Sequence, residues 1–225
     1  MKYKNLIIVG TSHIAKQSVR EVEEAIVKEK PAFVALELDK DRLMALIRGE
    51  RSNVTIRHIF RVGLGGYLLL KLGRYIEEKL GRSIGSQLGG EMLKSLEIAN
   101  KQGCKIALVD QDVRITLKKF SKAFNWRVKF KLVWDLLKGL VKREKMSFDL
   151  NKVPDKDFIV VILGQFKDRY PGIYNALVHD RNIYMAKKLT KLMTMGKTLA
   201  VVGAGHEEGL IEEIKKIEKN KKKAE

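Results

Sequence analysis

Residues 6–13 read Leu-Ile-Ile-Val-Gly-Thr-Ser-His, and residues 199–206 read Leu-Ala-Val-Val-Gly-Ala-Gly-His. In both stretches a short apolar run leads into a Gly-x-x-His turn. Two further apolar runs of this kind occupy residues 33–36 and 106–109. Runs that are apolar throughout, without alternation, are typical of strands covered on both faces of a sheet. These four runs therefore predict the strands of an α/β fold.

Helical patterns separate the strands. Apolar residues at helical spacing predict helices over residues 18–28 and 91–101. A series of β-α-β units makes parallel sheets with right-handed crossovers. We therefore expect a central, largely parallel or mixed sheet flanked by helices.

The middle of the chain has a different pattern, and we expect a long helical insertion there, at about residues 56–86 and 118–150. One amphipathic helix is predicted over residues 120–145. Residues 157–164 favour a strand by composition but are assigned to a helix. The predicted helices of this region and the next are a glycine-broken helix or hairpin at 56–81, the helix at 120–145, and two helices at 154–170 and 172–195 divided by Pro171.

The composition predicts one domain over residues 1–225, with a Lys-rich tail at 215–225. The chain has 225 residues, 45% of them hydrophobic, and no linker rich in proline, glycine or serine. We see neither a signal peptide nor an apolar run long enough to cross a bilayer. A single cysteine, Cys104, suits a reducing compartment. We expect a cytoplasmic protein, with peripheral association with a membrane as an option.

Polar residues follow each predicted strand. His13, Glu37, Asp110 and His206 all stand just after apolar runs. Because ligands of open parallel sheets bind outside the carboxyl ends of the strands, we expect these residues to converge. Imidazoles with carboxylates suit a divalent transition metal such as Mn, Co or Zn, which can activate water.

Each of these residues also has a structural interpretation. Either histidine fits a hydrogen-bonded turn, and Glu37 fits a helix cap. Glu91 sits in the first turn of a predicted helix, where the helix dipole alone favours an acid. A dinucleotide site is not expected, because glycines 203, 205 and 209 give GxGxxxG rather than GxGxxG.

With these residues in view, the chain resembles the TraB family, which is grouped with Tiki-type metalloproteases, erythromycin esterases and ChaN haem-binding proteins. The motifs that carry the resemblance extend over nearly the whole chain. They are Gly10-Thr11-Ser12-His13, Glu37 with Arg42, Gly89-Gly90-Glu91-Met92, Asp110-Gln111-Asp112 with Thr116-Leu117, Asp180-Arg181-Asn182 with Tyr184-Met185-Ala186, and Val201 to His206.

The resemblance implies a mixed α/β sheet and a site built from two Gly-x-x-His motifs and acidic residues. It also implies metal-dependent peptide hydrolysis, as in Tiki-like members, or shutdown of a peptide pheromone, as in bacterial TraB-like proteins. Two motifs depart from the usual pattern. Gln111 replaces an arginine, and Asp180 replaces a glutamate with a longer reach.

We expect a metal-dependent hydrolase that acts on peptides. The alternative is a regulatory protein that binds a peptide or small ligand without turnover. The expected metal ligands are His13, Glu37, Glu91 and His206; the expected catalytic residues are Glu37, Glu91, Arg42, Asp180, Arg181 and Asn182.

The net charge of +18 directs attention to residues 120–145. Trp126, Phe130 and Trp134 lie on one helical stripe with Val133, Leu137, Leu140 and Val141, and lysines and arginines flank it. Such stripes usually pack on their own domain or on a subunit, which is our first expectation and allows a homo-oligomer. An anionic membrane surface is the second option. Nucleic acid ranks lower, because the aromatic residues do not interleave with the basic ones.

Overall fold

In a computed structural model of the chain, residues 1–11, 16–49, 62–71, 90–142 and 156–224 are described. Five strands form one sheet in the order β1-β2-β5-β3-β4, and only β1 runs antiparallel to its neighbour. This arrangement confirms the predicted α/β fold with a largely parallel sheet. The strands are β1 (Lys2–Tyr3), β2 (Leu6–Thr11), β3 (Phe33–Leu36), β4 (Lys105–Leu108) and β5 (Thr198–Gly203).

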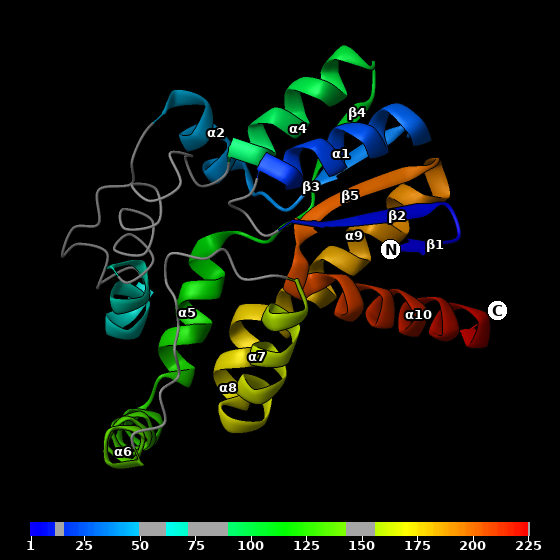
Figure 1. Cartoon of the computed structure of the whole chain (residues 1–225). Helices are drawn as coiled ribbons and strands as arrows, with labels where there is room; N and C mark the ends of the chain where they lie inside the picture. The colour runs from blue at the N-terminus through cyan, green and yellow to red at the C-terminus, as the bar shows by residue number, and fades with distance from the viewer. Residues whose placement is uncertain (12–15, 50–61, 72–89, 143–155, 225) are drawn as a thin grey trace.

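Helices cover both faces of the sheet (Figure 1). On one face, α1 (Lys16–Glu29) and α4 (Gly90–Lys101) pack against strand residues that include Leu199. On the other face, α9 (Asp180–Met195) and α10 (Glu207–Ala224) pack against strand residues that include Ala200. Consecutive residues of a strand point to opposite faces. Since both faces are covered, every residue of β5 is buried, and this explains why its sequence is apolar after Thr198.

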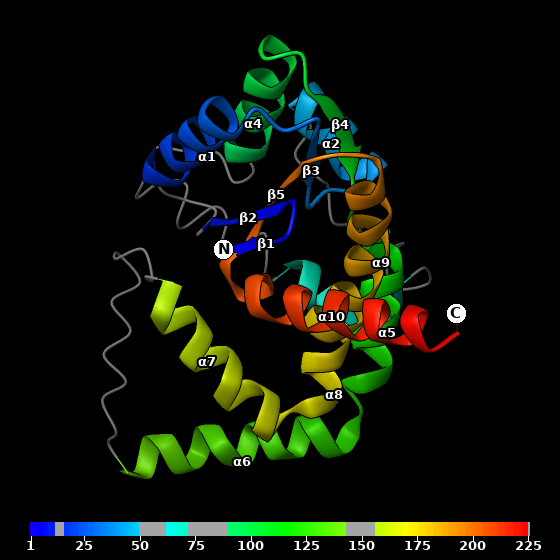
Figure 2. The same ribbon diagram turned by 90° about the vertical axis from the view of Figure 1, so that its right-hand side faces the viewer.

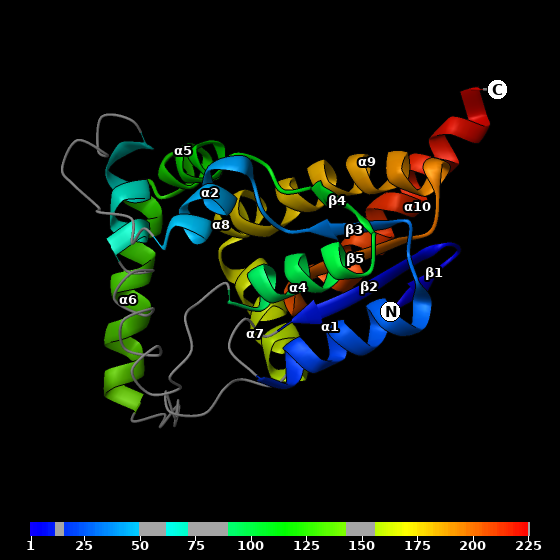
Figure 3. The ribbon, with the colours of Figure 1, turned by 90° about the horizontal axis from the view of Figure 1, so that it is seen from above.

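The remaining helices lie mostly beyond the carboxyl ends of the strands (Figure 3). Helix α7 confirms the helical assignment of residues 157–164, and α8 begins at Pro171, where a division was predicted. Residues 62–71 are also helical. The rest of the predicted insertion, at residues 56–61, 72–86 and 143–150, lies outside the described residues. The helices beyond the carboxyl ends of the strands are α2 (Lys40–Arg48), α5 (Val113–Ala123), α6 (Trp126–Lys142), α7 (Lys156–Arg169) and α8 (Pro171–Tyr174).

The prediction of one continuous helix over residues 120–145 is wrong. Helix α5 ends before Phe124, and α6 begins after Asn125. Phe124 stacks on Phe120 with ring centroids 5.4 Å apart, and Asn125 Oδ1 accepts a hydrogen bond from the Val128 amide at 3.2 Å. A side-chain acceptor of this kind satisfies a free amide at a helix start, so Asn125 favours a new helix there. Figure 2 shows α6 running across the lower end of α7 and α8.

Within the described part of the chain, no helix combines the length and the apolar character that crossing a bilayer requires.

Asp135 links α6 to α7 and to Tyr170 through hydrogen bonds, and we expect this contact to depend on pH. Its Oδ2 accepts hydrogen bonds from Arg169 Nε and the Tyr170 hydroxyl, both at 2.6 Å. The bonds from Arg169 and then Tyr170 lower the pKa of Asp135 to about 2. Because the pKa is lower in the folded state, the stabilisation is complete above about pH 4 and is lost as the pH falls towards 2.

We therefore expect the carboxyl carbon of Asp135 to titrate well below pH 3 when followed by NMR. In Tyr170→Phe, which removes one donor, the midpoint should rise. A midpoint near 4 in the unmodified chain would mean that Asp135 does not bind Arg169 and Tyr170 in solution.

Candidate functional site

Buried polar residues gather where the parallel strands end. Glu37 directly follows β3, Asp110 lies two residues beyond β4, and His206 closes a short 3-10 turn after β5. Arg181 and Asn182 reach the same place from the first turn of α9. We call these five residues the sheet-edge cluster. Their convergence agrees with the general rule that sites of open α/β sheets form at the carboxyl ends of the strands.

Arg181 is the centre of the sheet-edge cluster. Its Nη2 donates to Glu37 Oε1 and, at 2.7 Å, to Asp110 Oδ2, while its Nε donates to Asp110 Oδ1 at 3.0 Å. Its Nη1 lies 3.3 Å from the Leu177 carbonyl oxygen and 3.1 Å from His206 Nε2. The guanidinium therefore holds two carboxylates from different strands and one imidazole in a fixed arrangement.

The charges of the sheet-edge cluster depend on one another. Burial alone would lower the pKa of Arg181, but the charge of Glu37 and the hydrogen bonds and charge of Asp110 raise it above its ordinary value. The carboxylates are only 5% and 3% exposed. A buried charge that loses its partner is costly, so Arg181 must stay cationic while both carboxylates are ionised.

The ring of His206 has a defined orientation. Its Nδ1 lies 2.6 Å from Asn182 Oδ1, which can only accept, so the proton sits on Nδ1. Nε2 then carries a lone pair, which faces Arg181 and lies 3.3 Å from Glu37 Oε1. A Cβ on Gly209 would come within 2.2 Å of Asn182 Nδ2, so the glycine leaves the space that Asn182 fills.

Two backbone amides tie the strand ends together. Gly203 N–H donates to Glu37 Oε2 at 2.6 Å, and Gly10 N–H donates to Glu207 Oε1 at 2.6 Å. A Cβ on Gly10 would lie 2.4 Å from Glu207 Cδ, so a larger residue there would displace the Glu207 side chain from its bond to the Gly10 amide. In the sheet Gly10 pairs with Val202, and Thr11 with Gly203. The two Gly-x-x-His motifs therefore start side by side.

A π-helical turn introduces Arg181 and Asn182. Residues Asn175–His179 form this turn between α8 and α9. Turns of this type are uncommon and recur at functional sites. The carbonyl of Leu177, within the turn, accepts the hydrogen bond from Arg181. The turn thus helps to orient the guanidinium towards the strand ends.

The structure brings together five of the predicted site residues. Arg42 joins the others through its Nη1, which lies 3.2 Å from Asp110 Oδ2. Asp180 contacts Lys119 at 2.6 Å instead. His13 lies outside the described residues, and Glu91 lies in the first turn of α4 with its side chain outside them. The five residues are Glu37, Arg42, Arg181, Asn182 and His206.

One acidic residue of the sheet-edge cluster, Asp110, was not among the predicted site residues, and a second acid, Asp39, lies near Arg42. Asp110 was noted after its strand but not assigned a role, although it binds Arg181 through both oxygens. Asp39 caps α2 through Oδ1, and its buried Oδ2 has no hydrogen-bond partner among the described residues. Asp110 could have been assigned to the site from its position just after an apolar run. The sequence around Asp39 indicates only a helix cap.

The described residues include no group of three His, Cys, Asp or Glu side chains arranged to hold a metal ion. Two of the four expected ligands, His13 and Glu91, have side chains outside the described part, so the expected ligand set is only half described.

The chain has clear relatives. The sequence pattern of the TraB/PrgY/gumN family matches residues 2–221. An uncharacterized protein of Methanocaldococcus jannaschii is 36% identical over 220 residues, which cover 95% of this chain and 54% of that protein. TraB domain-containing proteins of mouse and human are 25% and 24% identical over 195 residues, covering 81% of this chain and 51% of each. The chain thus spans about half the length of these relatives, and it belongs to the TraB/PrgY/gumN family.

Proposed function

We propose that this chain is a metal-dependent hydrolase that acts on peptides, with its site at the sheet-edge cluster. One observation carries the proposal: His206 Nε2 and Glu37 Oε1 are both acceptor atoms, lie 3.3 Å apart, and face the same cation, Arg181. Two acceptors held this close at the ends of neighbouring strands need a positive charge between or beside them.

The spacing of these two atoms suits a metal ion. Ligands about 2.1 Å from one ion lie roughly 3.0–3.4 Å apart in octahedral or tetrahedral geometry. The bond from His206 Nδ1 to Asn182 also resembles the outer contacts that orient metal-binding imidazoles. We propose His13 and Glu91 as the further ligands, and Mn, Co or Zn as the metal.

Each residue of the sheet-edge cluster would have its own role in hydrolysis. A bound divalent ion would supply a water activated at neutral pH. Arg181 and Arg42 would hold a substrate carboxylate or the negative charge that develops on the peptide carbonyl oxygen. Asp110 binds both arginines, so it would keep them in place. Asn182 would hold the ring of His206.

A second function, ligand binding without turnover, is favoured by a different observation. Arg181 already neutralises Glu37 and Asp110, so this part of the cluster is balanced without a metal. In that case Arg42, whose side chain is 42% exposed, would recruit the carboxylate of a peptide.

Metal dependence of peptide cleavage separates the two functions. The full chain would be stripped with a chelator, reloaded with Mn, Co or Zn, and incubated with a mixture of peptides that is followed by mass spectrometry. We expect about one ion per chain and cleavage that the chelator abolishes. Peptide binding without cleavage, whichever metal is added, would instead support the second function. A chain that binds neither metal nor peptide would contradict both functions.

A further inference from the structure

Helix α6 carries a stripe of large apolar side chains that the described part of the chain leaves exposed. Each member is at least half exposed. Such a contiguous apolar surface is uncommon on a soluble protein unless something binds there. The expectation was packing on the stripe's own domain or on a subunit, and in the described part of the chain these residues do not pack on their own domain. The α6 stripe consists of Trp126, Phe130, Val133, Trp134 and Leu137.

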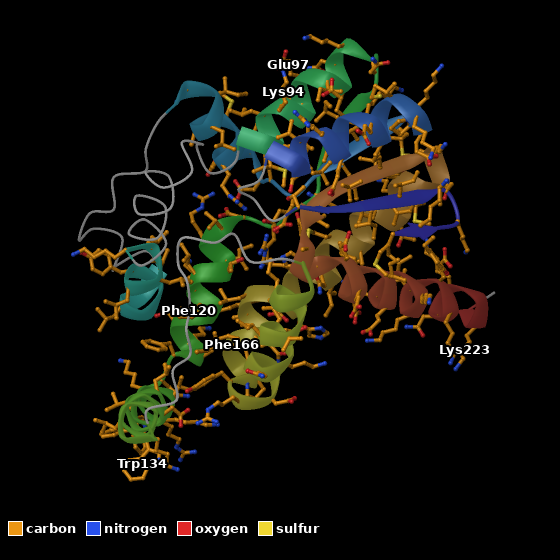
Figure 4. The ribbon with its side chains drawn as sticks, viewed as in Figure 1. Lys94, Glu97, Phe120, Trp134, Phe166 and Lys223 are labelled. Carbon is orange, nitrogen blue, oxygen red and sulfur yellow. The ribbon has the colours of Figure 1, made fainter. Side chains whose placement is uncertain are left out.

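The opposite face of α6 holds the helix in place. Val128 and Leu132 pack on a small core around Phe120 and Tyr170, and Asp135 binds Arg169. Successive helical positions turn by about 100°, so these inward residues leave the α6 stripe on the outer side. Figure 4 shows Trp134 pointing away from the body of the molecule. The stripe is therefore presented outward by a helix anchored from behind.

Basic side chains flank the α6 stripe and lie against its aromatic rings. The guanidinium of Arg127 is 5.6 Å from the centre of the Trp126 ring, and Lys138 Nζ is 5.3 Å from that of Trp134. Helix α6 contains five basic residues and one acid, Asp135, which is already paired with Arg169. The exposed charge of this face is consequently positive.

We propose that the α6 stripe binds the surface of an anionic phospholipid bilayer, an interaction separate from the proposed hydrolase activity. Tryptophan beside lysine and arginine suits the level of the lipid head groups, where the rings enter the apolar boundary and the cations meet phosphate. A second copy would bring equally basic flanks against these, which disfavours self-association. The lipid surface offers both an apolar layer and the complementary charge.

Intrinsic fluorescence tests the proposal directly, because the chain has two tryptophans and both belong to the stripe. The full chain would be mixed with vesicles containing roughly one-third phosphatidylserine in phosphatidylcholine, and with pure phosphatidylcholine vesicles. We expect a blue shift and co-sedimentation with the first kind only, both weakening at high salt as the charges are screened.

A charge-matched pair of variants locates the contact. Lys129→Glu/Lys138→Glu should weaken binding to the anionic vesicles by roughly 30-fold or more, since each basic residue near such a surface contributes about a fivefold factor to the affinity. Lys219→Glu/Lys223→Glu changes the net charge equally but at the far end of α10, and should keep most of the binding. Equal losses in the two variants, no binding at low salt, or a blue shift caused by dimerisation without lipid would each overturn the proposal.

Discussion

Replacing Arg181 with methionine is expected to lower the free energy of unfolding by about 3–5 kcal/mol. The methionine fills much of the volume but leaves Glu37 and Asp110 buried without their cation, and both carboxylates are almost fully shielded from water. Equilibrium unfolding in urea measures the change. Arg181→Lys should recover only part of the loss, because one ammonium cannot reproduce the forked contacts to both oxygens of Asp110.

Two further variants identify the cause of this loss. Arg114→Met also removes an arginine from an aspartate, Asp112, but this pair lies at the surface, so the free energy of unfolding should hardly change. Adding Asp110→Asn to Arg181→Met should restore part of the stability, because one unpaired buried charge is removed. If Arg181→Met costs no more than Arg114→Met, the sheet-edge cluster is not a buried ion-pair network in solution.

The sheet was largely predictable because strands buried on both faces have short runs of apolar residues without polar alternation. The run at residues 33–36 was placed correctly, and the other three runs were placed to within one or two residues at each end. Strand β1 was missed because it has only two residues, Lys2 and Tyr3, and neither is fully buried. The position of β5 between β2 and β3 was not predicted either, since the order of parallel strands depends on which crossovers pack, and not on the strand sequences.

The site was predictable in its location but not in its arrangement. Glu37 and His206 follow strands, so the rule for parallel sheets brings them to one edge. Arg181 and Asn182 come from a helix start, and only the family resemblance suggested them. That Arg181 would bind both carboxylates depends on the π-helical turn before it, a feature that spacing in the sequence does not reveal.

Amphipathic pattern alone also could not show which side of α6 is buried. The predicted stripe included Leu140 and Val141, whose side chains lie outside the described part, and its aromatic members are exposed. The inward face uses the smaller set of Val128 and Leu132, helped by the ion pair of Asp135 with Arg169. Polar contacts at a helix interface carry no apolar period, so they are invisible to this kind of pattern.

Replacing His206 with alanine is expected to lower the affinity of the chain for Mn, Co or Zn by more than about 100-fold, beyond the roughly 10–100-fold that loss of an outer contact costs. The proposed function assigns a metal-binding lone pair to His206 Nε2, so the variant removes one ligand directly. Asn182→Ala, which removes only the acceptor for Nδ1, should fall within the smaller range. Isothermal titration calorimetry on the chelator-stripped chain measures both changes.

The chain supplies its own control for this comparison. His179 lies in the π-helical turn, outside the hydrogen bonds of the sheet-edge cluster, so His179→Ala should leave metal affinity unchanged while removing the same ring. Asn182→Asp keeps an acceptor opposite Nδ1 and should retain more affinity than Asn182→Ala, a difference that a general loss of packing would not produce. Urea unfolding of each variant separates metal loss from unfolding. If folded His206→Ala binds the ion as tightly as His179→Ala does, His206 is not a ligand, and the closed ion-pair cluster around Arg181 is the better account of why these residues meet.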